Sequence, residues 1–409
     1  MNHRRILLVA LALLGLVALG CAMVTTGERP KNKSPYLPSA ETLERLSLDL
    51  VWHAEVDASD IVKAYLLRDT ICLETASLQF YAIDASTGLI RWQTQFSLPP
   101  FVGPCDNSKQ VFLIDSGLLR AFDKATGQVM WRTRLYSDPA ATPAASDTIV
   151  FVSTADHDIK GFSTADGKLM FTYHTRGAMA ARPAAEGDTV YTGDEAGCVY
   201  AVSSIKKEIP WQKKPFPEED LVWERQLRKG VQAPVELSEK AVLVGCGDWL
   251  IYALDKATGA PLWQHSTGSM VLAEPTCVEG AVYVTSFQNG IHAYDAVAGN
   301  PLWTFADGTD FVTAAGDKYV YLRNQKGKIV ALDKKTGAVQ WMLAPSRYDF
   351  VLKNRWTSPI FMASKDGRVV AIAEKGAKML TYQPPAPPSA KPAPKKAAPK
   401  LPAPKKAEE

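Results

Sequence analysis

One short pattern recurs along the chain and restricts its fold more than any other feature of the sequence. Residues 81–92 read YAIDASTGLIRW, and close copies follow at 121–131, 252–263, 293–303 and 331–341. Weaker copies occupy 161–171, 201–211 and 371–380. The copies end at 92, 131, 171, 211, 263, 303, 341 and 380, so the intervals are 38 to 40 residues except for one of 52. Eight units of about forty residues predict a repeat protein whose neighbouring units share their cores.

Each unit has the composition of a small antiparallel sheet. Runs such as 147–154 and 281–288 alternate β-branched or aromatic residues with others, and turn residues separate them. The Asp-x-x-Thr-Gly segment is typical of a turn between two strands, because its glycine adopts the positive φ that the turn needs. Four strands per unit and eight units predict an all-β fold, an eight-bladed β-propeller of four-stranded blades over residues 46–383.

The tryptophan that ends most copies is expected to lie on the outer strand and dock on the next blade. Residues 49–55 match such a strand with no blade before it, and residues 379–382 compete for the same place, so the sequence leaves open which strand closes the ring. Trp249 and Trp356 fall outside the register and are expected to be packed. The docking residues predicted on this basis are Trp52, Trp92, Trp131, Trp211, Trp263, Trp303 and Trp341.

The amino-terminal segment predicts export. Residues 1–5 are basic and residues 6–19 form an apolar run too short for an ordinary membrane span. The sequence from Val17 to Cys21 resembles a bacterial lipobox, which predicts a signal peptide over 1–20, lipidation of Cys21 and a flexible tether over 21–45. Because no Asp follows Cys21, the expected location is the periplasmic face of the outer membrane. An ordinary signal peptide or an uncleaved anchor are the alternatives.

Charge is distributed unevenly along the chain. The whole chain carries 46 basic and 43 acidic residues, but residues 21–383 carry 38 and 41, so no nucleic-acid-binding face is expected. Residues 384–409 contain nine prolines and six lysines and are expected to be a disordered, extended tail. This tail either binds an anionic partner, such as cell wall or lipid headgroups, or is a solvated appendage.

The longest departure from the repeat is the insertion over residues 212–232. Pro217 precedes three acidic residues, and basic residues and Gly230 follow, a pattern that predicts a short helix. Trp223 and Leu227 would share one face of this helix. That face would either bind a protein partner or pack back on the propeller.

The repeat pattern Ala-x-Asp-x-x-Thr-Gly-x-x-x-Trp is similar to the tryptophan-docking motif of the quinoprotein, or PQQ-type, β-propellers. The resemblance covers about residues 46–383. One branch of this superfamily comprises dehydrogenases that hold pyrroloquinoline quinone and calcium on the propeller axis. Another comprises lipid-anchored, non-enzymatic propellers of the BamB type, which belong to the outer-membrane β-barrel assembly machinery. The lipobox, the tether and the eight plain blades resemble the second branch, which implies an envelope scaffold.

The resemblance also has implications for individual residues. BamB-type proteins contact the barrel subunit through a loop with Leu-x-Leu-Arg, and residues 225–228 keep its last two positions. This implies partner binding at Leu227 and Arg228, with Trp223 nearby. The enzyme alternative lacks the adjacent cysteine pair of the dehydrogenases, and no catalytic aspartate can be assigned. We therefore predict no catalytic residue, no metal site, and neither PQQ nor calcium.

Overall fold

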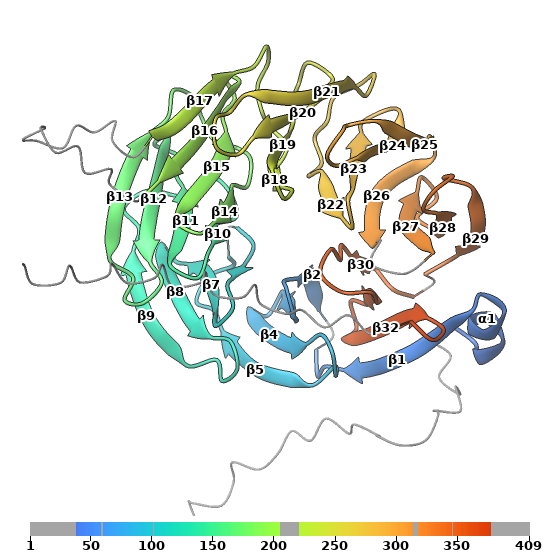
Figure 1. Ribbon diagram of the computed structural model, residues 1–409. Helices are drawn as coiled ribbons and strands as arrows, with labels where there is room; N and C mark the ends of the chain where they lie inside the picture. The colour runs from blue at the N-terminus through green and yellow to red at the C-terminus, as the bar shows by residue number, and fades with distance from the viewer. Residues whose placement is uncertain are drawn as a thin grey trace, which may run out of the picture.

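The computed structural model describes residues 38–377, apart from 59, 101, 205–220, 314–317 and 346. These residues form eight four-stranded antiparallel sheets arranged around a central axis (Figure 1). Each sheet runs outward from an inner strand near the axis to an outer strand at the rim. The predicted eight-bladed propeller is therefore confirmed.

Blades one to seven each consist of four strands that are consecutive in the chain. Blade one contains β2 (Ile61–Leu66), β3 (Thr70–Thr75), β4 (Gln79–Asp84) and β5 (Ile90–Gln95), and blade two contains β6 (Cys105–Asp106), β7 (Gln110–Asp115), β8 (Leu118–Asp123) and β9 (Val129–Arg134). Blade three contains β10 (Ala144–Ala145), β11 (Ile149–Ser153), β12 (Asp158–Ser163) and β13 (Leu169–His174), and blade four contains β14 (Ala184–Glu186), β15 (Thr189–Gly193), β16 (Cys198–Ser203) and β17 (Leu221–Gln226). Blade five contains β18 (Glu236–Leu237), β19 (Ala241–Gly245), β20 (Leu250–Asp255) and β21 (Pro261–Ser266), and blade six contains β22 (Thr276–Val278), β23 (Ala281–Ser286), β24 (Gly290–Asp295) and β25 (Pro301–Phe305). Blade seven contains β26 (Gly308–Thr313), β27 (Tyr319–Asn324), β28 (Ile329–Asp333) and β29 (Val339–Leu343).

Blade eight joins the two ends of the chain. Its first three strands are β30 (Phe350–Leu352), β31 (Ile360–Ala363) and β32 (Arg368–Glu374), and its outer strand is β1 (Leu48–Glu55) from the amino-terminal end. The strand at residues 49–55 therefore closes the ring. The competing segment at 379–382 lies outside the described residues.

The tether predicted over 21–45 is wrong for its last six residues. Helix α1 (Ala40–Arg45) begins after Ser39, whose side chain accepts a hydrogen bond from the Thr42 backbone N–H. Leu43 and Leu46 are buried in the same hydrophobic cluster as Trp341, at the seam between blades seven and eight. Burial of these two leucines explains why the segment is ordered.

The outer aromatic residue of each blade lies opposite a small residue on the third strand, and a β-bulge follows in the ladder. The small residue leaves room for the large ring. These pairs are Ala82–Trp92, Ala121–Trp131, Gly161–Phe171, Ala201–Trp223, Ala253–Trp263, Ala293–Trp303, Ala331–Trp341 and, across the closure, Ala371–Trp52.

Six docked tryptophans bind the turn between the last two strands of the next blade. The indole N–H of Trp92 donates to the Lys124 carbonyl at 3.0 Å, and the ring lies against Gly127, which has a φ of 71°. A Cβ at Gly127 would come within 3 Å of the indole, so both the conformation and the space favour glycine here. The same indole–carbonyl bond occurs at Trp52, Trp131, Trp223, Trp263 and Trp303.

Two predicted docking residues differ from this pattern. Trp341 has a buried indole N–H with no hydrogen-bond acceptor. Its neighbour, blade eight, takes its outer strand from the other end of the chain, so no Asp-x-x-Thr-Gly turn connects its last two strands. Trp211 lies outside the described residues, and Trp223 occupies the docking position of blade four. The extra residues of the long interval thus precede the outer strand of blade four.

Several predicted features also lie outside the described residues. These are the signal peptide at 1–20, Cys21, most of the tether and the tail at 384–409. Within the part that is described, no helix has the length and apolar character needed to cross a bilayer.

Candidate partner-binding face

The strand order places the connections of the propeller on two opposite faces. The Asp-x-x-Thr-Gly turns and the turns between the first two strands of each blade lie on one face, which we call the turn face. The turns between the second and third strands, and the loops that lead to the next blade, lie on the other, which we call the loop face. Because β1 begins and β32 ends at the turn face, both described chain ends lie there.

The loop face carries a group of exposed apolar side chains at blades five and six. Trp249 is 55% exposed, Met270 38%, Leu272 39% and Phe287 66%. We call these four residues the apolar patch. Exposed large apolar side chains that lie together, and not singly, are typical of protein interaction sites.

Backbone hydrogen bonds hold the segments of the apolar patch side by side. The Thr267 N–H donates to the Trp249 carbonyl, and the Phe287 N–H donates to the Met270 carbonyl, both at 2.9 Å. These bonds connect the β19–β20 turn to the loop between blades five and six, and that loop to the β23–β24 turn. The patch is therefore built on segments that are fixed to one another.

Trp249 is held in an unusual backbone conformation. Its φ is 72°, in the left-handed region that favours glycine. The equivalent turns of blades four, seven and eight have Gly197, Gly327 and Gly367 at this position, whereas those of blades one and three have Leu78 and His157. Each of these turns shares the same N–H to carbonyl bond. A large aromatic residue that is exposed and held in a conformation costing about 1–2 kcal/mol is a candidate for a functional role. The expectation that Trp249 is packed is wrong.

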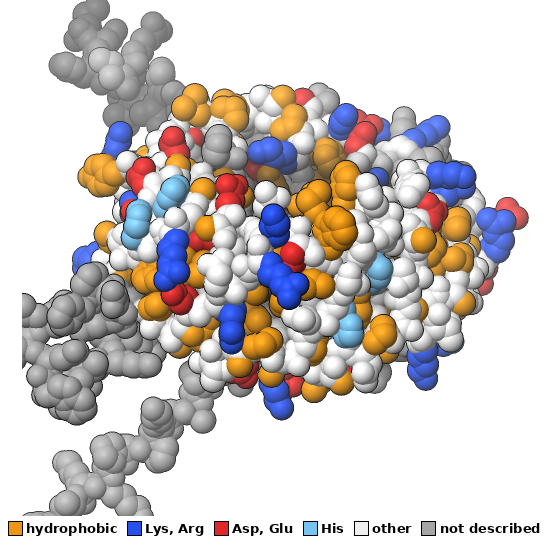
Figure 2. Space-filling model, turned by 90° about the horizontal axis from the view of Figure 1, so that it is seen from above, with side chains coloured by type: hydrophobic (Ala, Val, Ile, Leu, Met, Phe, Trp, Pro, Cys, Tyr) orange, Lys and Arg blue, Asp and Glu red, His pale blue; other side chains and the backbone are white. Residues whose placement is uncertain are grey.

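Basic residues lie beside the apolar patch. Arg228 and Lys229 are exposed in the loop between blades four and five. This loop is bound to the turn that carries Trp249, because the Gly247 N–H donates to the Gly230 carbonyl at 3.0 Å. In a view onto the side of the ring at blades four and five, hydrophobic and basic side chains lie next to each other on the surface (Figure 2).

The predicted helix in the insertion is absent from residues 221–232. Residues 221–226 form β17, which pairs with β16. Strand pairing and the docking of Trp223 on the next blade therefore determine the structure of this segment, and the helix-like charge pattern does not. Trp223 and Leu227 are buried in the core shared by blades four and five. Of the three residues predicted to bind a partner, only Arg228 has an exposed side chain. The residue that the repeat pattern did not single out is Trp249, the one tryptophan at this turn position among the described blades.

The axis of the ring is occupied by ion pairs between blades that are not neighbours. Arg355, after β30 of blade eight, pairs with Glu236 of blade five and with Glu274 before blade six. Glu274 also pairs with Arg182, before blade four, and with Lys353 at 3.2 Å. Such pairs can form only where the inner ends of distant blades meet, which is the centre of the ring in Figure 1.

These axial carboxylates have opposite electrostatic balances. Burial alone would raise the pKa of Glu274, but Arg182, Lys353 and Arg355 outweigh it and hold that pKa well below its usual range. At Glu236, burial outweighs the attraction of Arg355 and raises the pKa. Both carboxylates form ion pairs with cationic side chains of the protein.

The resemblance to quinoproteins places a quinone and calcium on this axis in the dehydrogenases. Here the Arg355 guanidinium lies 4.5 Å from the ring centroid of Trp356, so a protein cation, and not a flat ligand, covers this face of the ring. Among the described residues no group of three His, Cys, Asp or Glu side chains is arranged to hold a metal. These residues do not fit the cofactor. That the protein binds neither PQQ nor calcium stays a prediction.

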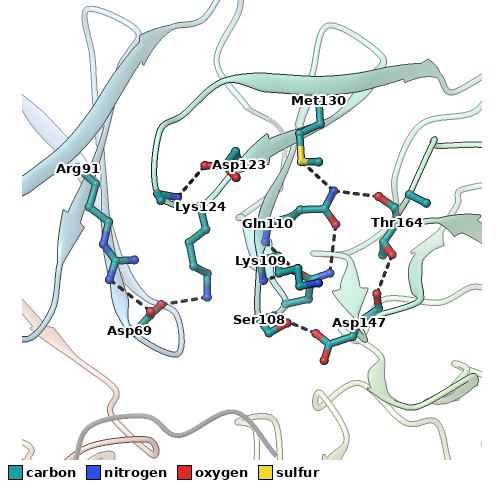
Figure 3. Close-up of a pocket in the computed structure, with 13 residues that line it drawn as sticks. Asp69, Arg91, Ser108, Lys109, Gln110, Asp123, Lys124, Met130, Asp147 and Thr164 are labelled. Atoms are coloured by element: carbon teal, nitrogen blue, oxygen red, sulfur yellow. Dashed lines mark hydrogen bonds and ion pairs between the residues drawn. The ribbon is translucent and has the colours of Figure 1, made fainter. Parts of the chain in front are cut away.

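A cavity of about 660 Å³ opens on the turn face between blades one, two and three (Figure 3). Three of its charged side chains form ion pairs: Asp69 binds Arg91 and Lys124. Asp147 accepts a hydrogen bond from the Ser108 N–H. The Gln110 amide donates to the Thr164 carbonyl at its base. These groups connect neighbouring blades.

Two further sets of residues whose types can bind metals have structural roles. Asp158, in the Asp156–His157–Asp158 segment, binds His174 Nδ1 at 3.0 Å and pairs with Lys160, as a polar turn would. The described cysteines are free, and all but Cys277 are buried, as expected for small apolar core residues.

Comparison with known proteins identifies the family. The model of the family described as outer membrane protein assembly factor BamB matches residues 98–215 and 216–387, which is more than half of the chain. The chain belongs to this family. Among BamB proteins, that of Alteromonas naphthalenivorans is 28% identical over 110 residues, which are 25% of this chain and 26% of that protein. The chain therefore matches about a quarter of the length of this BamB relative.

Solved structures agree with this assignment at the level of the fold. BamB from Moraxella catarrhalis superposes with a TM-score of 0.62 at 20% identity, over 80% of this chain and 98% of that chain. The computationally designed protein Ika8 gives a TM-score of 0.58 at 16% identity, over 78% and 97%. At these identities the likeness shows the propeller fold alone.

Proposed function

We propose that this chain is a lipid-anchored, non-enzymatic scaffold of the machinery that assembles outer-membrane β-barrel proteins. In this proposal Cys21 carries the lipid, the ring lies on the periplasmic side of the outer membrane, and no quinone or metal takes part. Membership of the BamB family supports the assembly role. The paired side chains on the axis and in the turn-face cavity support a role without catalysis.

The apolar patch is the observation that carries the proposal. It combines large apolar side chains, a strained tryptophan and the exposed cations of Arg228 and Lys229 on segments bound to one another. Burial of the patch against a partner would remove apolar surface from water, and an acidic rim on the partner would complement the two cations. A protein of the assembly machinery with an apolar surface flanked by acidic residues is the expected partner.

The test is capture from crosslinked envelopes in mild detergent, followed by mass spectrometry. The wild-type chain should recover a barrel-assembly protein, and the double variant Trp249→Ser with Phe287→Ser should recover it at least tenfold less. The matched control is Val297→Ser with Leu302→Ser, two exposed apolar residues of blade six away from the patch. Equal recovery by both double variants, or none by the wild type, would contradict the proposal.

A further inference from the structure

We propose that the turn face of the ring rests on the phospholipid membrane to which the chain is anchored. The proposal rests on the anchor of the proposed function, and it adds the orientation of the ring relative to that membrane. It begins with the apolar side chains that the turn face exposes, which we call the aliphatic rim. They are between 40% and 70% exposed: Leu89, Val129, Met130, Leu169, Met170, Leu262, Val297, Leu302 and Val339.

The aliphatic rim has the same place in each blade that contributes to it. Its members lie in the turn before the outer strand or in the first two residues of that strand, at the turn-face end. Blades one, two, three, five, six and seven each contribute at least one member, and the equivalent turn of blade four lies outside the described residues. The rim therefore follows the edge of the turn face around most of the ring, whereas the apolar patch of the loop face lies at blades five and six.

A planar surface contacts such a rim better than one globular partner does. An ordinary protein interface buries about 800 Å² on each side. An interface of that size covers part of a ring, and it leaves uncovered most of the apolar side chains that are spread over six blades. Aliphatic side chains along one flat face can all enter the boundary between lipid headgroups and acyl chains at once.

The two chain ends lie on the same face as the rim. Leu48 pairs with Glu374 at the turn-face end of blade eight, and the Lys375 N–H donates to the Ser47 carbonyl at 2.8 Å. The chain that leads back to Cys21 therefore leaves the ring on the turn face. Seventeen residues separate Cys21 from the first described residue, at position 38, so an anchor at Cys21 keeps that point within about 60 Å of the membrane. The anchoring membrane is thus presented to the rim at a high effective concentration.

Charge on the turn face indicates which kind of lipid surface fits. Two lysines of the turns already have carboxylate partners on this face, because Lys256 pairs with Glu186 at 2.7 Å and Lys334 pairs with Glu279 at 2.5 Å. The contact therefore depends on burial of the aliphatic rim, and not on attraction between lysines and anionic headgroups. We expect contact with zwitterionic phospholipid and little effect of salt.

This orientation also bears on the partner of the proposed function. The loop face is opposite the turn face, so a ring that rests on the membrane by its turn face directs the apolar patch away from the lipid. The patch, with Trp249 and Phe287, is then open to a partner in the periplasm.

Quenching of a fluorescent label by a lipid-borne nitroxide tests the contact. The lipid-anchored chain is reconstituted in phosphatidylcholine vesicles with an NBD label at Met170→Cys on the turn face. The matched control is a label at Tyr136→Cys, in a loop of the loop face where Tyr136 is 91% exposed. Among the described cysteines only Cys277 is partly exposed, so the chain without either substitution gives the labelling background. With a nitroxide on the acyl chains, quenching should be at least about fivefold stronger at position 170 than at position 136, at low and at high salt.

A second measurement removes part of the rim and leaves the label in place. Four rim residues in other blades, Val129, Leu262, Leu302 and Val339, are changed to Ser, and quenching at position 170 should fall by at least about threefold. The matched control changes four exposed apolar residues of the loop face to Ser and should retain the quenching: Leu98, Trp249, Met270 and Phe287. All eight side chains are exposed, so their loss leaves the core intact.

Three results would overturn the proposal. These are equal or stronger quenching at position 136, quenching at position 170 that the rim variant retains in full, and an emission shift at position 170 that grows with protein concentration without nitroxide quenching. The last would place a second copy of the chain on the turn face. A chain that is missing from the vesicle fraction would contradict the anchor of the proposed function, whereas a chain that stays on the vesicles without quenching at position 170 would contradict the orientation alone.

Discussion

Arg355 forms an ion pair with Glu236 although the two residues are 119 positions apart and belong to blades eight and five. Neighbouring blades of the propeller are joined by tryptophan docking, whereas this pair joins blades across the axis. Because Glu236 and Glu274 are largely buried, their charges depend on the cations that face them. The axis should therefore contribute to the stability of the whole ring.

Removal of the Arg355 side chain from the axis should destabilise the fold. Arg355→Ala leaves two buried carboxylates without their shared partner, and we expect a loss of about 3–5 kcal/mol in the free energy of unfolding. Arg176→Ala removes an arginine from a more exposed pair with Glu224 and should cost no more than about 1 kcal/mol. Urea unfolding followed by tryptophan fluorescence measures both. Equal losses of unfolding free energy would show that the axial ion pairs stabilise the fold no more than the exposed pair does.

The acid sensitivity of the protein should depend on Glu274. Its pKa lies below the ordinary value of 4.5 in the folded chain, so the stability due to its ionised form is lost as pH falls below about 4.5. The raised pKa of Glu236 acts in the opposite direction and favours the fold at low pH. Between pH 5 and pH 3, Glu274→Gln should therefore reduce the slope of unfolding free energy against pH, by at most about 1.4 kcal/mol per pH unit.

The control for this pH series is Glu239→Gln, an exposed carboxylate in the turn between β18 and β19. It should leave the slope unchanged. If both variants follow the wild-type curve, acid unfolding begins elsewhere in the molecule.

The indole hydrogen bond of a docked tryptophan should be measurable by comparison of two blades. Trp303 donates to the Lys334 carbonyl at 2.8 Å, whereas the Trp341 indole N–H is buried without an acceptor. Replacement by Phe removes a similar volume at both sites. Trp303→Phe should cost about 0.5–1.5 kcal/mol more than Trp341→Phe. A larger cost at Trp341 would mean that its N–H has a partner.

The turn glycine should be essential where a tryptophan docks on it. Gly127→Ala adds a methyl group that meets Trp92 and also strains a φ of 71°. Gly280 has a φ of 80° but no atom within 4 Å of a Cβ, so Gly280→Ala reports strain alone. We expect thermal unfolding to show an additional loss of about 1–3 kcal/mol for Gly127→Ala. Equal losses would show that the indole moves aside without cost.

Much of the fold can be predicted from the repeat, because the repeated residues themselves form the contacts within each blade and between neighbouring blades. Spacing, turn chemistry and the docking tryptophan fix the blade count, the strand count and the role of Trp92 or Trp303. The tryptophan of blade four was harder to identify. Trp211 completes a weak copy of the motif, and only the pairing of Trp223 with Ala201 shows which tryptophan faces the small residue.

The candidate site was less predictable for a physical reason. Its features arise where distant segments meet, as at the axis, or where one residue departs from a repeated turn, as at Trp249. The feature is visible in the sequence only after the turns have been aligned, because that position holds glycine in three other blades and Leu78 and His157 in two more. Helix α1 was missed because Leu43 and Leu46 are too few to form a periodic pattern.

Site-specific photo-crosslinking in living cells tests the scaffold account most directly. A photoreactive amino acid at Phe287, in the apolar patch, is compared with one at Val297, which is equally exposed in the β24–β25 turn of the same blade. We predict a crosslink from position 287 to a barrel-assembly protein, identified by mass spectrometry, and none from position 297. A crosslink to that protein from position 297 but not from position 287 would contradict the account.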